Sequence, residues 1–128
     1  MNRTPRQHER GSAVVDFVLV GALVTVLLAG VLQLALTLHV RATLIDCAAE
    51  GARHGALAGS SPAVGVQRTR ELIDSALSPT YSDDVTATVS DLGGAPVLVV
   101  SVRAPLPVIG LLGPSGAFEV SGRALMEA

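Results

Sequence analysis

An uninterrupted run of uncharged, mostly apolar residues from Phe17 to Leu38 constrains this chain more than any other feature of its sequence. Its twenty-two residues span about 33 Å as an α-helix, which matches the ~30 Å hydrocarbon core of a lipid bilayer. The run therefore predicts a transmembrane helix over residues 17–38.

Charge is distributed unevenly around this span. Residues 1–11 carry three Arg and one Glu, whereas residues 39–128 carry six Arg and nine acidic residues. Positively charged flanks stay in the cytoplasm. We therefore expect a single-pass protein of the cytoplasmic (inner) membrane, with its N-terminus inside and its C-terminal domain outside the cytoplasm.

The remaining sequence predicts an α+β fold. No Pro occurs between Ser12 and Pro62, so the membrane helix is expected to continue outside the membrane, over 12–58. The Ser60-Ser61-Pro62 sequence predicts the start of a second, amphipathic helix of about 16 residues that ends at Pro79. Alternating or β-branched segments at 85–89, 97–102 and 118–126 predict a small three-stranded antiparallel sheet, and residues 105–116 an apolar loop.

Three parts of the chain follow from this pattern. They are a polar cytoplasmic leader or tail (1–11), a long N-terminal helix (12–58) and a small extracytoplasmic α/β domain (59–128). The strand at 97–102 is a continuous apolar run, which is typical of a central strand covered on both faces.

Small residues occur at helical spacing in two parts of the long helix. Within the span, one 80° arc carries a small and polar stripe, the kind of surface that helices use to pack in lipid: Ala22, Thr25, Ala29 and Gln33. Beyond it, Gly51, Gly55 and Gly59 repeat every four residues, beside a second stripe of Ala48, Ala52 and Ala56. Glycine is costly inside a helix, so these glycines predict close helix packing, with the sheet leaning on this face. Simple tolerance of Thr and Gln, and fraying near Gly59, are the alternatives.

Composition excludes several functions. Net charge is −2 and only Phe17, Tyr81 and Phe118 are aromatic, so nucleic-acid binding is not expected. Cys47 is the single cysteine and is interpreted as a small buried apolar residue. His, Ser and acidic residues form no recognisable catalytic or metal-binding pattern. We therefore expect no enzyme, no cofactor, no metal site and no small-molecule substrate.

The segment from Gly11 to Phe17 is the most informative short motif. Gly11 stands at a polar-to-apolar junction, an acid (Asp16) follows five residues later, and an aromatic residue (Phe17) comes next. An ionisable group at the edge of a membrane span is a functional candidate. This arrangement resembles the leader of type IV prepilins, and the Asp16-Phe17 pair is similar to the corresponding pair of Flp pilins.

The chain is longer than a Flp pilin, and nearly its whole length resembles the TadE-like pseudopilins of tight-adherence pili. The likeness includes an Ala-rich continuation of the helix that contains Glu50-Gly51-Ala52-Arg53. The resemblance implies that a prepilin peptidase cuts between Gly11 and Ser12 on the cytoplasmic side. It implies as partners other pilin-like subunits and an inner-membrane assembly platform, and possible incorporation into the pilus. The sequence departs from the family pattern in having Asp16 where Glu is usual and Ser12 where a bulkier first residue is common.

Three alternatives remain open. Asp16 can be an acid favoured by the dipole of a helix N-terminus. The whole protein can be a bitopic, membrane-anchored binding module that keeps its leader. Signal peptidase I can remove the apolar segment, although the run is long for a signal peptide and no clear cleavage site follows it.

Overall fold

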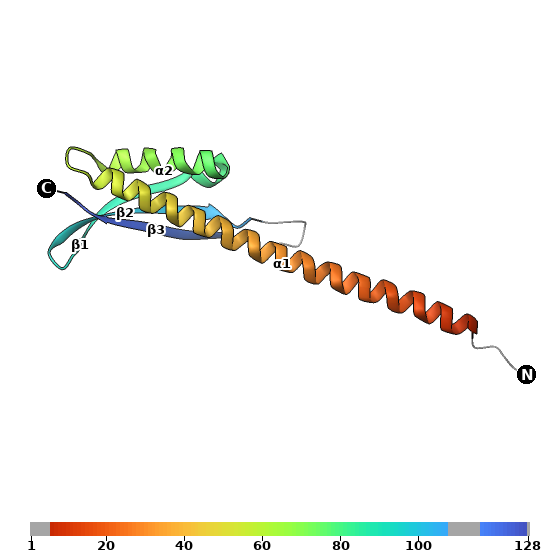
Figure 1. The fold of residues 1–128 in the computed structure, drawn as a ribbon. Coiled ribbons are helices and arrows are strands. Elements are labelled where there is room, and N and C mark those ends of the chain that lie inside the picture. The colour runs from red at the N-terminus through yellow and green to blue at the C-terminus, as the bar shows by residue number, and fades with distance from the viewer. Residues whose placement is uncertain (1–5, 108–115, 128) are drawn as a thin grey trace, which may run out of the picture. The chain divides into compact units, whose positions relative to one another are not determined.

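The structure is a computed structural model that describes residues 6–107 and 116–127; the predicted loop lies partly outside these residues, as do the first five residues of the predicted leader. The elements follow in the order α1 (Arg6–Ala56), α2 (Pro62–Ala76), a short 3-10 helix η1 (Pro79–Ser82), β1 (Asp84–Leu92), β2 (Ala95–Pro105) and β3 (Ala117–Leu125) (Figure 1). The predicted α+β fold is therefore confirmed. The chain divides into two compact units, Met1–Ala35 and Leu36–Ala128.

The first unit contributes the N-terminal part of α1. Its apolar side chains are exposed on all sides of the helix, and the most exposed is Phe17 at 80%. By length and composition, α1 is the one helix among the described residues that is able to cross a membrane. Such exposure suits a helix whose solvent is lipid, because an apolar surface all around a helix needs an apolar environment.

The bounds of α1 differ from the prediction at both ends. The helix begins at Arg6 and not at Ser12, so it includes the last residues of the predicted leader. Residues 6–10 lack Gly and Pro, and Glu9 in the first turn is favoured by the helix dipole. The helix ends at Ala56, and Gly59 then adopts a left-handed backbone with φ of 80°. Gly59 thus belongs to the turn after the helix.

In the second unit, α2 begins as the sequence predicts. The Ser61 side chain caps the helix by accepting a hydrogen bond from the Val64 backbone N–H, and Pro62 occupies the first turn. The residues after α2 differ from the prediction, because Pro79 starts the η1 helix. Ser78 caps η1, and the buried Ser82 hydroxyl donates a hydrogen bond of 2.6 Å to the Asp74 carboxylate of α2.

The three strands form one antiparallel sheet in the order β1-β2-β3. Gly93 and Gly94 connect β1 to β2 with φ values of 62° and 92°, the pair of positive values that a type I′ hairpin turn requires. The register places Val85 opposite Val102, and Val102 opposite Val120. β2 is therefore the central strand, as predicted.

The prediction that β2 is covered on both faces is wrong for most of the strand. Alternate residues Leu98, Val100, Val102 and Ala104 are buried, whereas on the other face Val97 is buried, Val99 and Ser101 are half-buried and Arg103 is exposed. One face of the sheet carries the core and the other, the open face, is left without a covering element among the described residues.

The core lies between this sheet, α2 and the last third of α1. Val40, Leu44, Ala48 and Ala52 of α1 are buried with Ile73 of α2 and with the inward residues of the strands. Gly122 of β3 is buried directly against the α1 backbone at Ala48 and Ala49, where a Cβ atom would collide with backbone atoms. The sheet thus leans on the small-residue face of the long helix, as the glycine and alanine spacing predicts.

Candidate processing and assembly site

The residues predicted for processing and assembly all lie on α1. Gly11, Ser12, Asp16 and Phe17 are exposed, and Ser12 precedes Asp16 by about one turn, roughly 6 Å along the axis. A Cβ atom added at Gly11 would meet nothing within 4 Å, so packing in this chain does not require glycine there. Asp16 has no ion-pair partner within 4.0 Å among the described residues. The backbone at Gly11 and the carboxylate of Asp16 are therefore available to another molecule.

The predicted small and polar stripe is also on the surface of α1. Ala22, Thr25 and Ala29 are exposed, and Gln33 is half-buried. The Thr25 hydroxyl donates a hydrogen bond of 2.8 Å to the Gly21 carbonyl one turn earlier. This bond satisfies the hydroxyl within its own helix, so the stripe presents a narrow surface without an unsatisfied Thr donor.

Gly51 and Gly55, in contrast, are brought into close contact with α2. The Gly65 carbonyl would lie 2.8 Å from a Cβ atom at Gly51, and the Gly65 Cα would lie 3.0 Å from one at Gly55. The buried Thr69 side chain faces Gly51, and its hydroxyl donates to the Gly65 carbonyl at 2.8 Å. Gly51 and Gly55 therefore lie at the crossing of α1 and α2.

Sequence reasoning missed the partner residues of this crossing. Gly65 and Thr69 stand four residues apart in α2, which is the spacing of one helix face, but nothing in a single helix says which glycine meets which. The alternation of residues 118–126 puts Gly122 on one face of the last strand with Val120 and Ala124, but only its contact with α1 explains why a glycine stands there.

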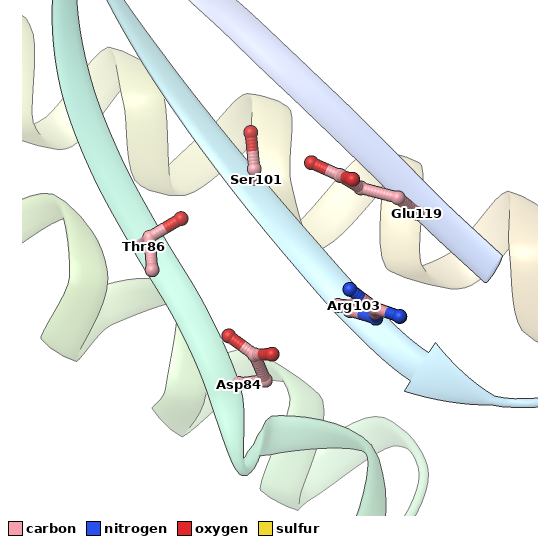
Figure 2. A pocket seen from close by; sticks show the side chains of 5 residues that line it. All are labelled: Asp84, Thr86, Ser101, Arg103 and Glu119. Carbon is pink, nitrogen blue, oxygen red and sulfur yellow. The ribbon is translucent and has the colours of Figure 1, made fainter. Parts of the chain in front are cut away.

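The open face carries a polar depression that the sequence did not predict. A cavity of about 190 Å³ is lined by Asp84, Thr86, Ser101, Arg103 and Glu119, and Figure 2 shows these five side chains on neighbouring strands. The register sets Arg103 between Asp84 on one side and Glu119 on the other. Opposite charges on adjacent strands stabilise a sheet. The depression therefore has a structural explanation.

The long helix and the folded unit together indicate a general class of protein. An exposed apolar helix long enough to cross a membrane precedes a compact α+β unit, an arrangement that is consistent with a membrane-anchored protein. Residues 11–53 match the family model described as TadE-like protein, which confirms the resemblance over this segment. No curated protein and no solved structure matches the chain.

The matched segment coincides with the residues singled out above. It starts at Gly11 and contains the apolar span, Asp16, Phe17 and Gly51. It ends at Arg53, before α2 and the sheet begin. The match therefore concerns the long helix.

Proposed function

We propose that the protein is a minor pseudopilin that takes part in assembly of a tight-adherence (Flp, type IVb-like) pilus or of a related secretion machine. The observation that carries this proposal is the TadE-like match that begins at Gly11, the junction at which the polar leader meets the apolar helix. Its work is assembly and not catalysis. It acts through contacts of its helix in the membrane and of its domain outside.

The proposed cycle begins with cleavage. A prepilin peptidase removes residues 1–11 on the cytoplasmic side, which gives Ser12 a free α-ammonium group. Ser12 and Asp16 lie one turn apart on α1. A neighbouring helix displaced by about one turn then brings its α-ammonium group next to Asp16, where the attraction is strengthened by the low dielectric near lipid. The exposed stripe of Ala22, Thr25 and Ala29 allows the two helices to approach closely.

The domain outside the cytoplasm is proposed to prime, cap or adapt the filament while the helix contacts pilin-like subunits and the inner-membrane platform. Its sheet is held against α1 by the buried contact at Gly122. Anchoring of the sheet on the helix supports this role, because a rigid domain presents its surface in one orientation relative to that part of the helix.

The test is the N-terminus of the mature protein. Intact mass and N-terminal sequencing of protein purified from membranes of a host with an active prepilin peptidase should show that residues 1–11 are lost. Gly11→Leu should remain uncut. Gly21→Leu is the matched control, since Gly21 is an equally open glycine of α1, and this variant should be cut normally. A mature protein that still begins at Met1 or Asn2 argues against the proposal.

The second candidate is a bitopic binding module that keeps its leader and presents the outer domain to an envelope component. The helix that starts at Arg6 favours it, because α1 runs through Gly11 without a break. Retention of residues 1–11 together with a normally folded outer domain is the result that selects this candidate.

A further inference from the structure

Three exposed leucine side chains of the second unit gather at one end of the sheet. The Glu127 backbone N–H donates to the Ala56 carbonyl at 2.8 Å, and the Met126 N–H donates to the Pro96 carbonyl at 3.0 Å. These bonds bring together the end of α1, the residues after β3 and the start of β2 (Figure 1). Leu57, Leu92 and Leu125, exposed at 47%, 63% and 66%, all belong to this end, which we call the distal end.

A groove of about 430 Å³ opens at the distal end between the last turn of α1 and the end of β3. Leu57 and Leu125 contribute apolar walls, and Arg53 and Arg123 contribute guanidinium groups from opposite elements. The exposed Arg53 guanidinium also donates to the Glu50 carboxylate of the same helix at 3.3 Å. The Glu127 carboxylate, which also lines the groove, accepts a hydrogen bond of 3.2 Å from the Ala58 backbone N–H. The groove therefore offers apolar surface and positive charge to an occupant.

The β1–β2 hairpin presents the complementary chemistry. Asp91 and Leu92 are adjacent and exposed just before the Gly93-Gly94 turn, and successive residues of a strand point to opposite faces. Leu92 is on the open face, with Arg123 and Leu125 of β3, and Asp91 is on the face that packs against the helices, where Arg53 of α1 lies. Leu92 thus has an apolar counterpart, Leu125, on its own face of the sheet, and Asp91 has a basic counterpart, Arg53, on the other face.

The sheet topology sets these features at the same height. Both edge strands, β1 and β3, are antiparallel to β2, so they run in the same direction. The register aligns Ser90, Val97 and Leu125 in one row, and Leu92 lies two residues further towards the turn, on the same face of the sheet as Leu125. Two copies that share one orientation, side by side, place the β1 edge of one next to the β3 edge of the other. The hairpin of the first copy then stands level with the groove of the second.

We infer that the groove at the distal end receives the β1–β2 hairpin of a second copy of this chain. Leu92 of one copy packs between Leu57 and Leu125 of the next, and Asp91 approaches Arg53. The contact joins two different surfaces, so each copy still has one free groove and one free hairpin, and the association can extend along a row. The shared orientation of the copies rests on the proposed function, in which every copy is anchored in one membrane.

Cysteine cross-linking of the full-length protein in membranes tests this inference. In a Cys47→Ala background, a chain that carries both Leu57→Cys and Leu92→Cys should form a ladder of disulfide-linked dimers, trimers and larger species. Either cysteine alone should give monomer, because each cross-link needs one cysteine of each kind. Absence of the ladder, a ladder that stops at the dimer, or efficient cross-linking of Leu92→Cys alone would overturn the inference.

Variants added to the double-cysteine chain separate charge from packing. Asp91→Arg should lower the cross-linked fraction about two- to fivefold, the effect of one exposed ion pair, and Asp91→Arg with Arg53→Glu should restore it. Because Leu57 forms one wall of the groove and now carries the cysteine, Leu125→Ser is the packing variant, with an expected loss of about tenfold. Val64→Ser, at a residue that is 43% exposed on α2, is the matched control and should change nothing.

Equal effects of Val64→Ser and Leu125→Ser, or no recovery in the charge exchange, contradict the contact. The ladder is measured in membranes whether or not residues 1–11 have been removed. Failure of this inference is thereby distinguished from failure of the proposed processing at Gly11.

Discussion

Asp16 is an acidic side chain exposed at the start of an apolar helix, without an ion-pair partner among the described residues. A carboxylate at the edge of a hydrocarbon layer is costly unless water, lipid or another charge stabilises it. A helix N-terminus offers some stabilisation, but α1 begins ten residues earlier, at Arg6, and the dipole effect falls off beyond the first turn. While residues 6–11 are attached, the helix dipole therefore does not account for Asp16, and this supports the proposed partner from another chain.

Asp16→Asn tests this explanation. Asn keeps the size and hydrogen bonding of the side chain but removes its charge, so cleavage at Gly11 should continue while association with other pilin-like subunits falls. Asp16→Glu keeps the charge and should behave like the unaltered protein. Co-purification with partner pilins and pilus yield are the measurements. Normal assembly by a cleaved Asn variant would contradict charge pairing.

Cys47 is a buried thiol on the inner face of α1, as the sequence predicts. Burial, with a smaller contribution from the Asp46 carboxylate, raises the pKa of this thiol above its ordinary value of 9.0. The native state therefore holds the neutral thiol more strongly than the unfolded state does. This contribution to the free energy of unfolding is fully present below the pKa that the Cys47 thiol has in the unfolded chain. It is lost as pH rises through the higher pKa that the thiol has in the folded protein.

Two measurements on Cys47 follow. At pH 8 a thiol-alkylating reagent should react slowly with the native protein and rapidly in denaturant. The free energy of unfolding should also fall as pH rises above the ordinary pKa of 9.0, and Cys47→Ala should weaken that dependence. Native-state alkylation as fast as that of a free thiol would show that the thiol is not buried.

The crossing of α1 and α2 shows how non-local contacts decide the function of a glycine. Gly21 and Gly51 both lie inside α1. Gly21 faces open space, whereas Gly51 faces the Gly65 carbonyl and the Thr69 side chain. Alanine is better than glycine in an open helix by about 1 kcal/mol, whereas overpacking a close contact costs roughly 1–3 kcal/mol. The same substitution should therefore have opposite effects at the two positions.

Gly51→Ala should destabilise the second unit, and Gly21→Ala should not. Alkylation of Cys47 during denaturant titration reports opening of this unit directly, since the thiol belongs to its core. Thr69→Ala should recover only part of the loss in the Gly51→Ala chain, because the Gly65 carbonyl is a backbone group that no side-chain change removes. Equal stability of the Gly21 and Gly51 variants would contradict the assigned crossing.

These elements also show what could be predicted and why the rest could not. Helix and strand periodicity are local, so the second helix, the hairpin at Gly93-Gly94 and the central position of β2 were all accessible from the sequence. Burial of a strand face is not local. The Val97–Val102 run predicted two covered faces, but Ser101 and Arg103 mark a face that carries no helix. Likewise, Gly122 needed the position of α1 before its role was apparent.

For the molecule as a whole, the sequence alone predicts the orientation, with residues 1–11 inside and the second unit outside the cytoplasm. A new cysteine in the second unit, in a Cys47→Ala background, should react with a membrane-impermeant reagent in intact spheroplasts. Ser82 is unsuitable, because it is buried and donates to Asp74. Ser90 is exposed on β1 and is the better position. Protection of Ser90→Cys until lysis would reverse the orientation and count against the pseudopilin proposal.

The contacts that close the second unit come from the last residues of the chain. Gly122 covers Ala48 and Ala49, and the Glu127 backbone N–H bonds the Ala56 carbonyl, so α1 is completed by residues synthesised some seventy positions later. During synthesis the part of α1 at Ala48 and Ala49 emerges early and stays without its Gly122 contact until β3 has been made. A chain that stops before Ala117 thus leaves this part of the apolar face uncovered, and such products should be the ones that quality-control proteases remove first.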